Sequence, residues 1–152
     1  MPTVLLPVPH FEQSQHGFCL PACVCMVLAH QNQPMSEQQL VKILGTRSFG
    51  TPISHVNRLQ AYQYQVEFRS FTEAELKAYL LQGVPLIARV WTGMLTYWHE
   101  ETFHVVVVVG YDDKYLYIND PAFAIAPQNV NWDSFLAAWA EYDEVAIAIR
   151  KQ

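Results

Sequence analysis

Three side chains of this sequence could together perform nucleophilic acyl chemistry: Cys19, His104 and Asp120. Cys19 opens an apolar segment, CLPACVCMVLAHQ, that we expect to be helical, with Pro21 in its first turn. The N-terminus of a helix carries partial positive charge, which favours a thiolate, and a neighbouring imidazolium would pair with it. Cys19 is therefore placed where a cysteine can act as a nucleophile.

His104 and Asp120 lie in one segment, TFHVVVVVGYDDKYLYINDP, that predicts two consecutive strands. His104 begins the first strand, Asp120 ends the second, and residues 112–114 form a tight turn between them. The two residues are equally distant from a turn centred near residue 112, so we expect them to lie opposite each other. Side chains at such positions have Cβ atoms about 5 Å apart, close enough for a carboxylate to orient an imidazole.

Gln13 and two tryptophans are candidates for the surroundings of this chemistry. Gln13 precedes Cys19 by six residues, and its amide together with the Cys19 N–H could stabilise an oxyanion. Trp91 and Trp98 flank the segment that leads to His104. They could pack in the core, as large aromatic residues often do, or form the wall of a cleft that binds apolar substrate side chains.

The other cysteines and histidines do not predict a further site. Cys23 and Cys25 lie inside the predicted helix, where we expect core packing and no disulfide. The segment from His99 to His104 resembles the HExxH zinc motif, but its histidines are five residues apart and a strand follows. We therefore expect neither a metal nor another cofactor.

Length and composition predict one globular domain over residues 1–152. Hydrophobic residues make up 51% of the sequence and charged residues 15%, which favours a dense core. The net charge of −5 provides no basic surface, so we expect neither nucleic acid nor a membrane as a partner. The first residues lack the pattern of a signal peptide, and the run of valines is too short to span a bilayer, which predicts a cytoplasmic protein.

The pattern of capping residues, apolar spacing and turns predicts an α+β fold. Helices are expected at residues 19–31, 36–44, from 52 onwards, 72–83 and 132–140. Strands are expected at residues 65–71, 86–91, 103–111, 115–119 and 144–149. Because most helices come first and most strands later, we expect N-terminal helices packed on a C-terminal antiparallel sheet.

The ordered set of motifs resembles the papain-like clan, and within it the C39-like cysteine peptidases. The resemblance covers essentially the whole chain: Gln13, the CxPA start of the helix at 19–22, His104 before a valine strand and GYD, and NDP at 119–121. It implies a papain-like fold and a peptide or protein substrate. It also implies that Cys19 is the nucleophile, His104 the base and acid, Asp120 the orienting acid and Gln13 the oxyanion donor.

The sequence departs from this family on both sides of Cys19. Members that trim peptide leaders often carry an acidic residue before the cysteine and a glycine after it, where this chain has Phe18 and Leu20. Two alternatives to a peptidase stay open, and Leu20 motivates the second of them. One is a transglutaminase-like acyl or amide transferase, and the other is a non-catalytic peptide-binding module that retains the cleft.

Overall fold

The computed structural model describes residues 2–152. The helices are α1 (Cys19–His30), α2 (Glu37–Leu44), α3 (Glu73–Leu81), α4 (Trp132–Ala140) and the 3₁₀ helices η1 (Ile53–Tyr62) and η2 (Thr92–Met94). The strands are β1 (Val4–Leu5), β2 (Tyr64–Ser70), β3 (Leu86–Trp91), β4 (Phe103–Tyr111), β5 (Tyr115–Asn119), β6 (Gln128–Asn131) and β7 (Val145–Lys151). Within residues 2–152, no helix is long and apolar enough to cross a membrane.

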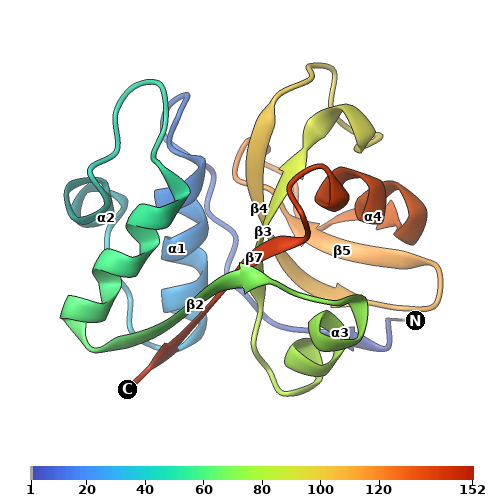
Figure 1. Ribbon diagram of the computed structural model, residues 1–152, viewed down its shortest axis with the longest axis horizontal. Helices are drawn as coiled ribbons and strands as arrows, with labels where there is room; N and C mark the ends of the chain where they lie inside the picture. The colour runs from blue at the N-terminus through green and yellow to red at the C-terminus, as the bar shows by residue number, and fades with distance from the viewer. Residues whose placement is uncertain (1) are drawn as a thin grey trace.

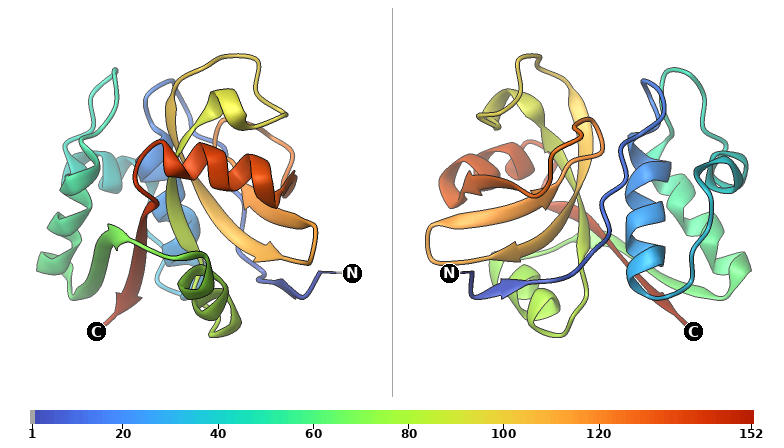
Figure 2. Two further views of the ribbon diagram at one scale, coloured as in Figure 1. Left: turned by 45° about the vertical axis from the view of Figure 1, so that its right-hand side comes forward. Right: turned by 180° about the vertical axis from the view of Figure 1, so that it is seen from behind.

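One antiparallel sheet divides the molecule into two layers of helices. Its strands follow the order β2-β7-β3-β4-β5-β6, and β1 pairs with β4 off this path. Helices α1 and α2 with η1 lie on one side, while α3 and α4 lie on the other (Figure 1). Figure 2 shows the same separation from two further directions. The α+β class predicted from the sequence is confirmed.

The run of valines in β4 follows from this layered arrangement. Val105, Val107 and Val109 belong to the hydrophobic core shared with α1, whereas Val106 and Val108 belong to the core on the opposite face. Because side chains alternate between the faces of a strand and both faces are covered, each position in this run is apolar. The strand is thereby fixed firmly, with His104 near its first end.

Most predicted element boundaries are confirmed where a capping residue marks them. Ser36 with Gln39 and Thr72 with Glu75 form capping boxes that start α2 and α3, as predicted. The segment after residue 52 is helical, but it forms a 3₁₀ helix. Its buried residues recur every third position, which matches the three residues per turn of that helix.

Two strands, β1 and β6, were absent from the predicted set. The first has only two residues, Val4 and Leu5, which pair with Tyr111 and Gly110. A side chain at position 110 would collide with the Val4 carbonyl oxygen, so the close approach of β1 depends on Gly110. Such a pairing depends on backbone contact and leaves little trace in the hydrophobic pattern.

Candidate active site

A cleft of about 390 Å³ opens between the two halves of the chain, and five of the six predicted site residues lie in its wall or directly behind it. Gln13, Cys19 and His104 line the cleft, and Trp98 forms part of its wall. They come from the N-terminal loop, the start of α1, the start of β4 and the loop after η2. The cleft therefore gathers residues that are far apart in the sequence.

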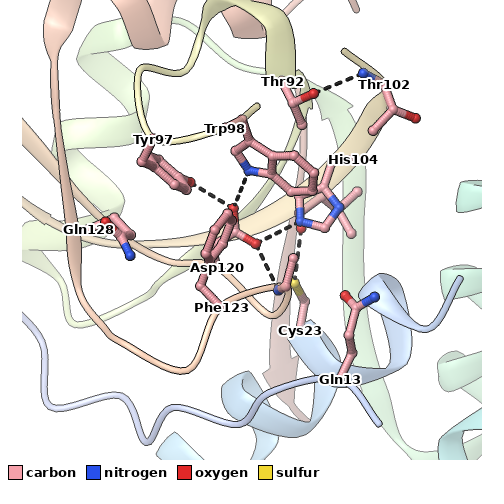
Figure 3. Close-up of polar contacts among 12 residues, drawn as sticks. Gln13, Cys23, Thr92, Tyr97, Trp98, Thr102, His104, Asp120, Phe123 and Gln128 are labelled. Atoms are coloured by element: carbon pink, nitrogen blue, oxygen red, sulfur yellow. Dashed lines mark hydrogen bonds and ion pairs between the residues drawn. The ribbon is translucent and has the colours of Figure 1, made fainter. Parts of the chain in front are cut away.

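His104 and Asp120 form a buried pair next to this cleft. The His104 Nε2 atom lies 2.7 Å from Asp120 Oδ1, and the two residues are 4% and 0% exposed (Figure 3). An ionised carboxylate can only accept hydrogen bonds, so Nε2 carries the hydrogen in this contact. The Nδ1 atom of the same ring is then free to exchange a proton with another group.

Four donors saturate the carboxylate of Asp120. Its Oδ1 accepts from His104 Nε2 and, at 2.9 Å, from the Ala122 N–H. Its Oδ2 accepts from the Tyr97 hydroxyl at 2.7 Å and from the Trp98 indole N–H at 2.8 Å (Figure 3). Burial raises the pKa of Asp120, but the hydrogen bond and charge of His104 and the remaining donors hold it below its ordinary value.

The surroundings of His104 favour its protonated form. Burial lowers the pKa of this imidazole, but hydrogen bonding to Asp120 and Cys19 and the charges of these two groups raise it further, to about 9. The Trp98 ring contacts the imidazole edge-on, with centroids 4.9 Å apart. An imidazolium is thus the stable form near neutral pH, and it can pair with a thiolate.

Helix α1 differs from the other α-helices at its N-terminus. The residues before α2, α3 and α4 accept a hydrogen bond from the first turn; these residues are Ser36, Thr72 and Asn131. Phe18, which precedes Cys19, provides no side-chain cap, and no acidic residue lies in the first turn of α1. The first N–H groups of α1 therefore remain available to an anion at the position of Cys19.

Cys19 also differs from the two cysteines that follow it. All three thiols are free, but Cys19 is partly exposed, whereas Cys23 and Cys25 are buried. Burial raises the pKa of Cys23 well above its ordinary value and that of Cys25 to about 12. The prediction that Cys23 and Cys25 pack in the core is confirmed.

Gln13 lines the cleft from a loop that is held by backbone contacts. Its N–H donates to the Pro121 carbonyl at 2.7 Å, directly after Asp120. Its side-chain Nε2 donates to the Gln15 carbonyl at 3.2 Å, while Oε1 is buried and has no hydrogen-bond partner within residues 2–152. An amide nitrogen has two hydrogens, so the Gln13 amide has one N–H beyond the one that it donates to Gln15.

Comparison of the sequence with known families identifies the wider group. The sequence model of the Peptidase_C39 like family matches residues 5–147. The chain belongs to this family. The resemblance drawn from the motifs is confirmed, and so is the papain-like fold that it implied.

Solved structures show the same fold as this C39-like chain. A C39-like protein from Bacillus anthracis superimposes with a TM-score of 0.81 at 16% identity, covering 98% of each chain. The peptidase domain of Streptococcus ComA, a bi-functional ABC transporter, gives 0.76 at 21% identity, covering 94% of this chain and 98% of that one. A double glycine motif protease from an AMS/PCAT transporter, in complex with its leader peptide, gives 0.73 at 21% identity, covering 99% and 96%.

One curated protein matches a shorter stretch. YvpB of Bacillus subtilis, itself uncharacterized, is 42% identical over 48 residues, which make up 32% of this chain and 19% of that protein. The match therefore spans less than a fifth of YvpB. Because YvpB is itself uncharacterized, this match gives no information about the activity of the chain.

The predicted register between His104 and Asp120 is wrong, although the two side chains do meet. Strand β4 pairs Val107 with Asn119, and this register places Asp120 opposite residue 106. The turn is centred between residues 113 and 114, and a β-bulge lies between Val108 and Gly110. Without that extra residue, Asp120 would fall on the other face of the sheet, because a shift of one residue reverses the faces.

The two tryptophans proposed for the cleft have different positions in this C39-like fold. Trp98 lines the cleft, and its indole N–H also donates to Asp120. It therefore helps to hold the carboxylate as well as forming part of the cleft wall. Trp91 is not among the lining residues within the described part of the chain. It pairs with Phe103 where β3 leaves the sheet, so the structure does not support its proposed place in the cleft.

Sequence reasoning missed the residues that hold the loop carrying Tyr97 and Trp98. Thr92 is fully buried; its hydroxyl donates to the Glu100 carbonyl at 2.6 Å and accepts from the Thr102 N–H at 2.8 Å. This clamp closes the loop so that Tyr97 and Trp98 reach Asp120 (Figure 3). The sequence contained one signal for these contacts. Tyr97 and Trp98 are adjacent, each carries a polar donor that needs a partner when buried, and both lie shortly before His104.

Proposed function

We propose that this chain is a cysteine peptidase that hydrolyses peptide bonds through a thioester on Cys19. The observation that carries the proposal is the buried contact of 2.7 Å between His104 and Asp120, beside the cleft that Cys19 lines. An imidazole oriented in this way, next to a partly exposed thiol at an uncapped helix N-terminus, is suited to acyl transfer. Family membership supports the same conclusion.

In the proposed starting state, the proton of Cys19 already resides on Nδ1 of His104, so a thiolate faces an imidazolium. Asp120 holds the opposite nitrogen, Nε2, so the ring presents Nδ1 to the cleft and the resulting imidazolium is stabilised. The thiolate attacks the substrate carbonyl carbon and forms a tetrahedral oxyanion. We assign the oxyanion to the free Cys19 N–H and the Gln13 amide, and such a donor contributes about 10²–10³-fold to the rate.

The second half of the reaction releases both products. His104 gives its proton to the leaving amine as the carbon–nitrogen bond breaks, which leaves an acyl group on the Cys19 sulfur. A water molecule then loses a proton to His104 and attacks the thioester. The thiolate departs, and the acyl group is released as a carboxylic acid.

A peptide substrate agrees with the chemistry of the cleft walls. Apolar rings and side chains line much of it, including Leu20, Phe49 and Phe103. Leu20 stands where many leader-trimming members have glycine; it is the second residue of α1, is only 3% exposed and packs in the core. The protease from the AMS/PCAT transporter was solved with a leader peptide, and we extend only the general class, a peptide, to this chain.

The test is hydrolysis of a diverse peptide mixture in isotopically labelled water, with products identified by mass spectrometry. We expect the parent protein to release fragments whose new C-terminal carboxylates carry label, and Cys19→Ala to release none. Cys23→Ala is the matched control, since it removes a buried thiol one turn further along α1, and it should retain turnover.

The same experiment separates the alternatives. Unlabelled products joined to an added amine would identify an acyl transferase. Peptide capture by Cys19→Ala, without any turnover by the parent protein, would identify a binding module. Either result would contradict the proposed hydrolysis.

A further inference from the structure

The loop that carries Gln13 is attached to helix α2 by a single carboxylate. The Ser14 N–H donates to Glu37 Oε2 at 3.0 Å, and the Ser14 hydroxyl donates to Glu37 Oε1. Glu37 is the first residue of α2, 23 positions further along the chain. Two hydrogen bonds to one charged acceptor fix both the position and the orientation of Ser14.

The residue before Ser14 is fixed from the other side. The Gln13 N–H donates to the Pro121 carbonyl, which follows Asp120. The backbone of Gln13 is therefore held at two points. Its own N–H binds the Pro121 carbonyl, and the next residue, Ser14, binds the start of α2. These two contacts fix the backbone of Gln13, while its side-chain Nε2 is held by the Gln15 carbonyl.

Helix α2 does not require Glu37 for its own cap. Its capping box consists of Ser36 and Gln39, which satisfy each other's backbone N–H groups. The partial positive charge at the N-terminus of α2 stabilises the Glu37 carboxylate. Its hydrogen-bond donors, however, belong to Ser14 in the loop that carries Gln13. Glu37 therefore stabilises the loop at Ser14 and is not needed to cap α2.

We propose that Glu37 is a positioning residue, which acts through Ser14 to hold the Gln13 amide where it can bind the oxyanion. This inference rests on the proposed function, in which Gln13 is the oxyanion donor. Oxyanion donors are effective because they are oriented before charge develops, so a loosened donor loses much of its effect while substrate binding is retained.

The test compares Glu37→Gln and Ser14→Ala with a matched control, Glu73→Gln. Glu73 is also the first residue of a helix with a capping box, but it pairs with Lys77 at the surface. We expect Glu37→Gln and Ser14→Ala to lower kcat about tenfold with KM unchanged, a fraction of the loss for a whole donor. Ser14→Thr, which retains the hydroxyl, should restore kcat.

Two further measurements separate positioning from a general structural effect. Alkylation of Cys19 by iodoacetamide forms no oxyanion, so its rate should be the same in Glu37→Gln and the parent protein. In a Gln13→Ala background, Glu37→Gln should have no additional effect on kcat, because the donor through which it acts is gone.

The outcomes are distinct. If the parent protein cleaves peptides and Glu37→Gln behaves like Glu73→Gln, or still lowers kcat without Gln13, the positioning role is wrong and the proposed function stands. If the parent protein cleaves no peptide, both proposals fall. Should Glu37→Gln not fold, Ser14→Ala at an exposed loop position decides the question alone.

Discussion

The two sides of the cleft are held in place by different means. On one side, His104 and Asp120 are buried, and four donors surround a single carboxylate. On the other side, Gln13 belongs to a loop whose attachment through Ser14 and Glu37 lies near the surface. His104 and Asp120 are thus buried in the protein, whereas the loop of Gln13 is attached to the surface of α2 by hydrogen bonds.

This difference separates stability from turnover. A change on the His104 side leaves a buried charge or donor without a partner, so it should lower the free energy of unfolding together with activity. A change on the Gln13 side exposes its polar groups to water, so activity should fall while stability changes little. Substitutions on the two sides should therefore affect stability and turnover in different proportions.

Asp120→Asn should produce the largest loss. An amide in this place must direct its NH₂ group either at the Trp98 N–H or at the donors His104 and Ala122, so a donor faces a donor. We expect a loss of about 3–5 kcal/mol in the free energy of unfolding, the range for breaking a buried ion pair. Denaturant unfolding would measure it.

The matched control for that change is Asp112→Asn at the other end of the hairpin. Asp112 also accepts several hydrogen bonds, including one from Tyr117, but in contact with solvent. We expect a much smaller loss there. Equal losses for Asp120→Asn and Asp112→Asn would mean that burial of the His104 side has no special importance.

Stability should depend on pH through His104. Its pKa in the folded protein is about 9, above the ordinary value of 6.5, so protonation of His104 stabilises the fold. This contribution is complete below pH 6.5 and is lost as the pH rises through about 9. We expect the parent protein to lose about 3 kcal/mol more than His104→Gln over this range. If the free energy of unfolding changed equally with pH in the two proteins, the prediction would be wrong.

Trp98→Phe should have an intermediate effect. The change removes an N–H donor from the buried carboxylate of Asp120 but retains most of the ring, and hydrogen bonds to charged groups contribute about 1.5–3 kcal/mol. Trp132→Phe is the control, since its N–H donates to a neutral carbonyl, that of Asp112. Thermal unfolding should show the larger loss for Trp98→Phe, and the reverse order would count against the saturated carboxylate.

Gly17→Ala should have the smallest effect on stability relative to its effect on turnover. Gly17 has φ +88°, and a Cβ there would come within 2.5 Å of the Ser48 carbonyl, which displaces the loop before Cys19. Gly83→Ala imposes the same backbone strain at φ +85° with no atom within 4 Å. We expect a lower kcat for Gly17→Ala alone, and a melting temperature below that of Gly83→Ala because the clash is with backbone atoms. Equal kcat values would show that this loop tolerates displacement.

Much of this fold follows from local sequence signals. The strands 86–91, 103–111 and 115–119 and the last helix have the predicted bounds, because apolar alternation and the cap at Asn131 are local features. Pairings that depend on the whole fold could not be predicted. The bulge before Gly110 and the short strand β1 depend on the approach of distant backbone segments.

The candidate site was predictable in its residue types and only partly in its contacts. Cys19, Gln13 and His104 follow from spacing along the chain, and the structure places all three around one cleft. The Tyr97 and Trp98 bonds to Asp120 depend on how an irregular loop closes, which no periodic pattern specifies. The same is true of the contact between Ser14 and Glu37.

The most direct test of the central claim, an activated Cys19–His104 pair, is alkylation by limiting iodoacetamide near neutral pH. The modified residue is mapped by mass spectrometry in the parent protein and in His104→Ala. The measurement needs no knowledge of the substrate. Since Cys23 and Cys25 are buried, selectivity for Cys19 alone would reflect exposure, and the comparison with His104→Ala isolates activation.

We predict that Cys19 is modified first and rapidly in the parent protein and that its rate falls sharply in His104→Ala. The loss follows because the imidazolium that stabilises the thiolate is removed. Equal rates of Cys19 modification in the two folded proteins would contradict the account, since the imidazole would then have no influence on the thiol.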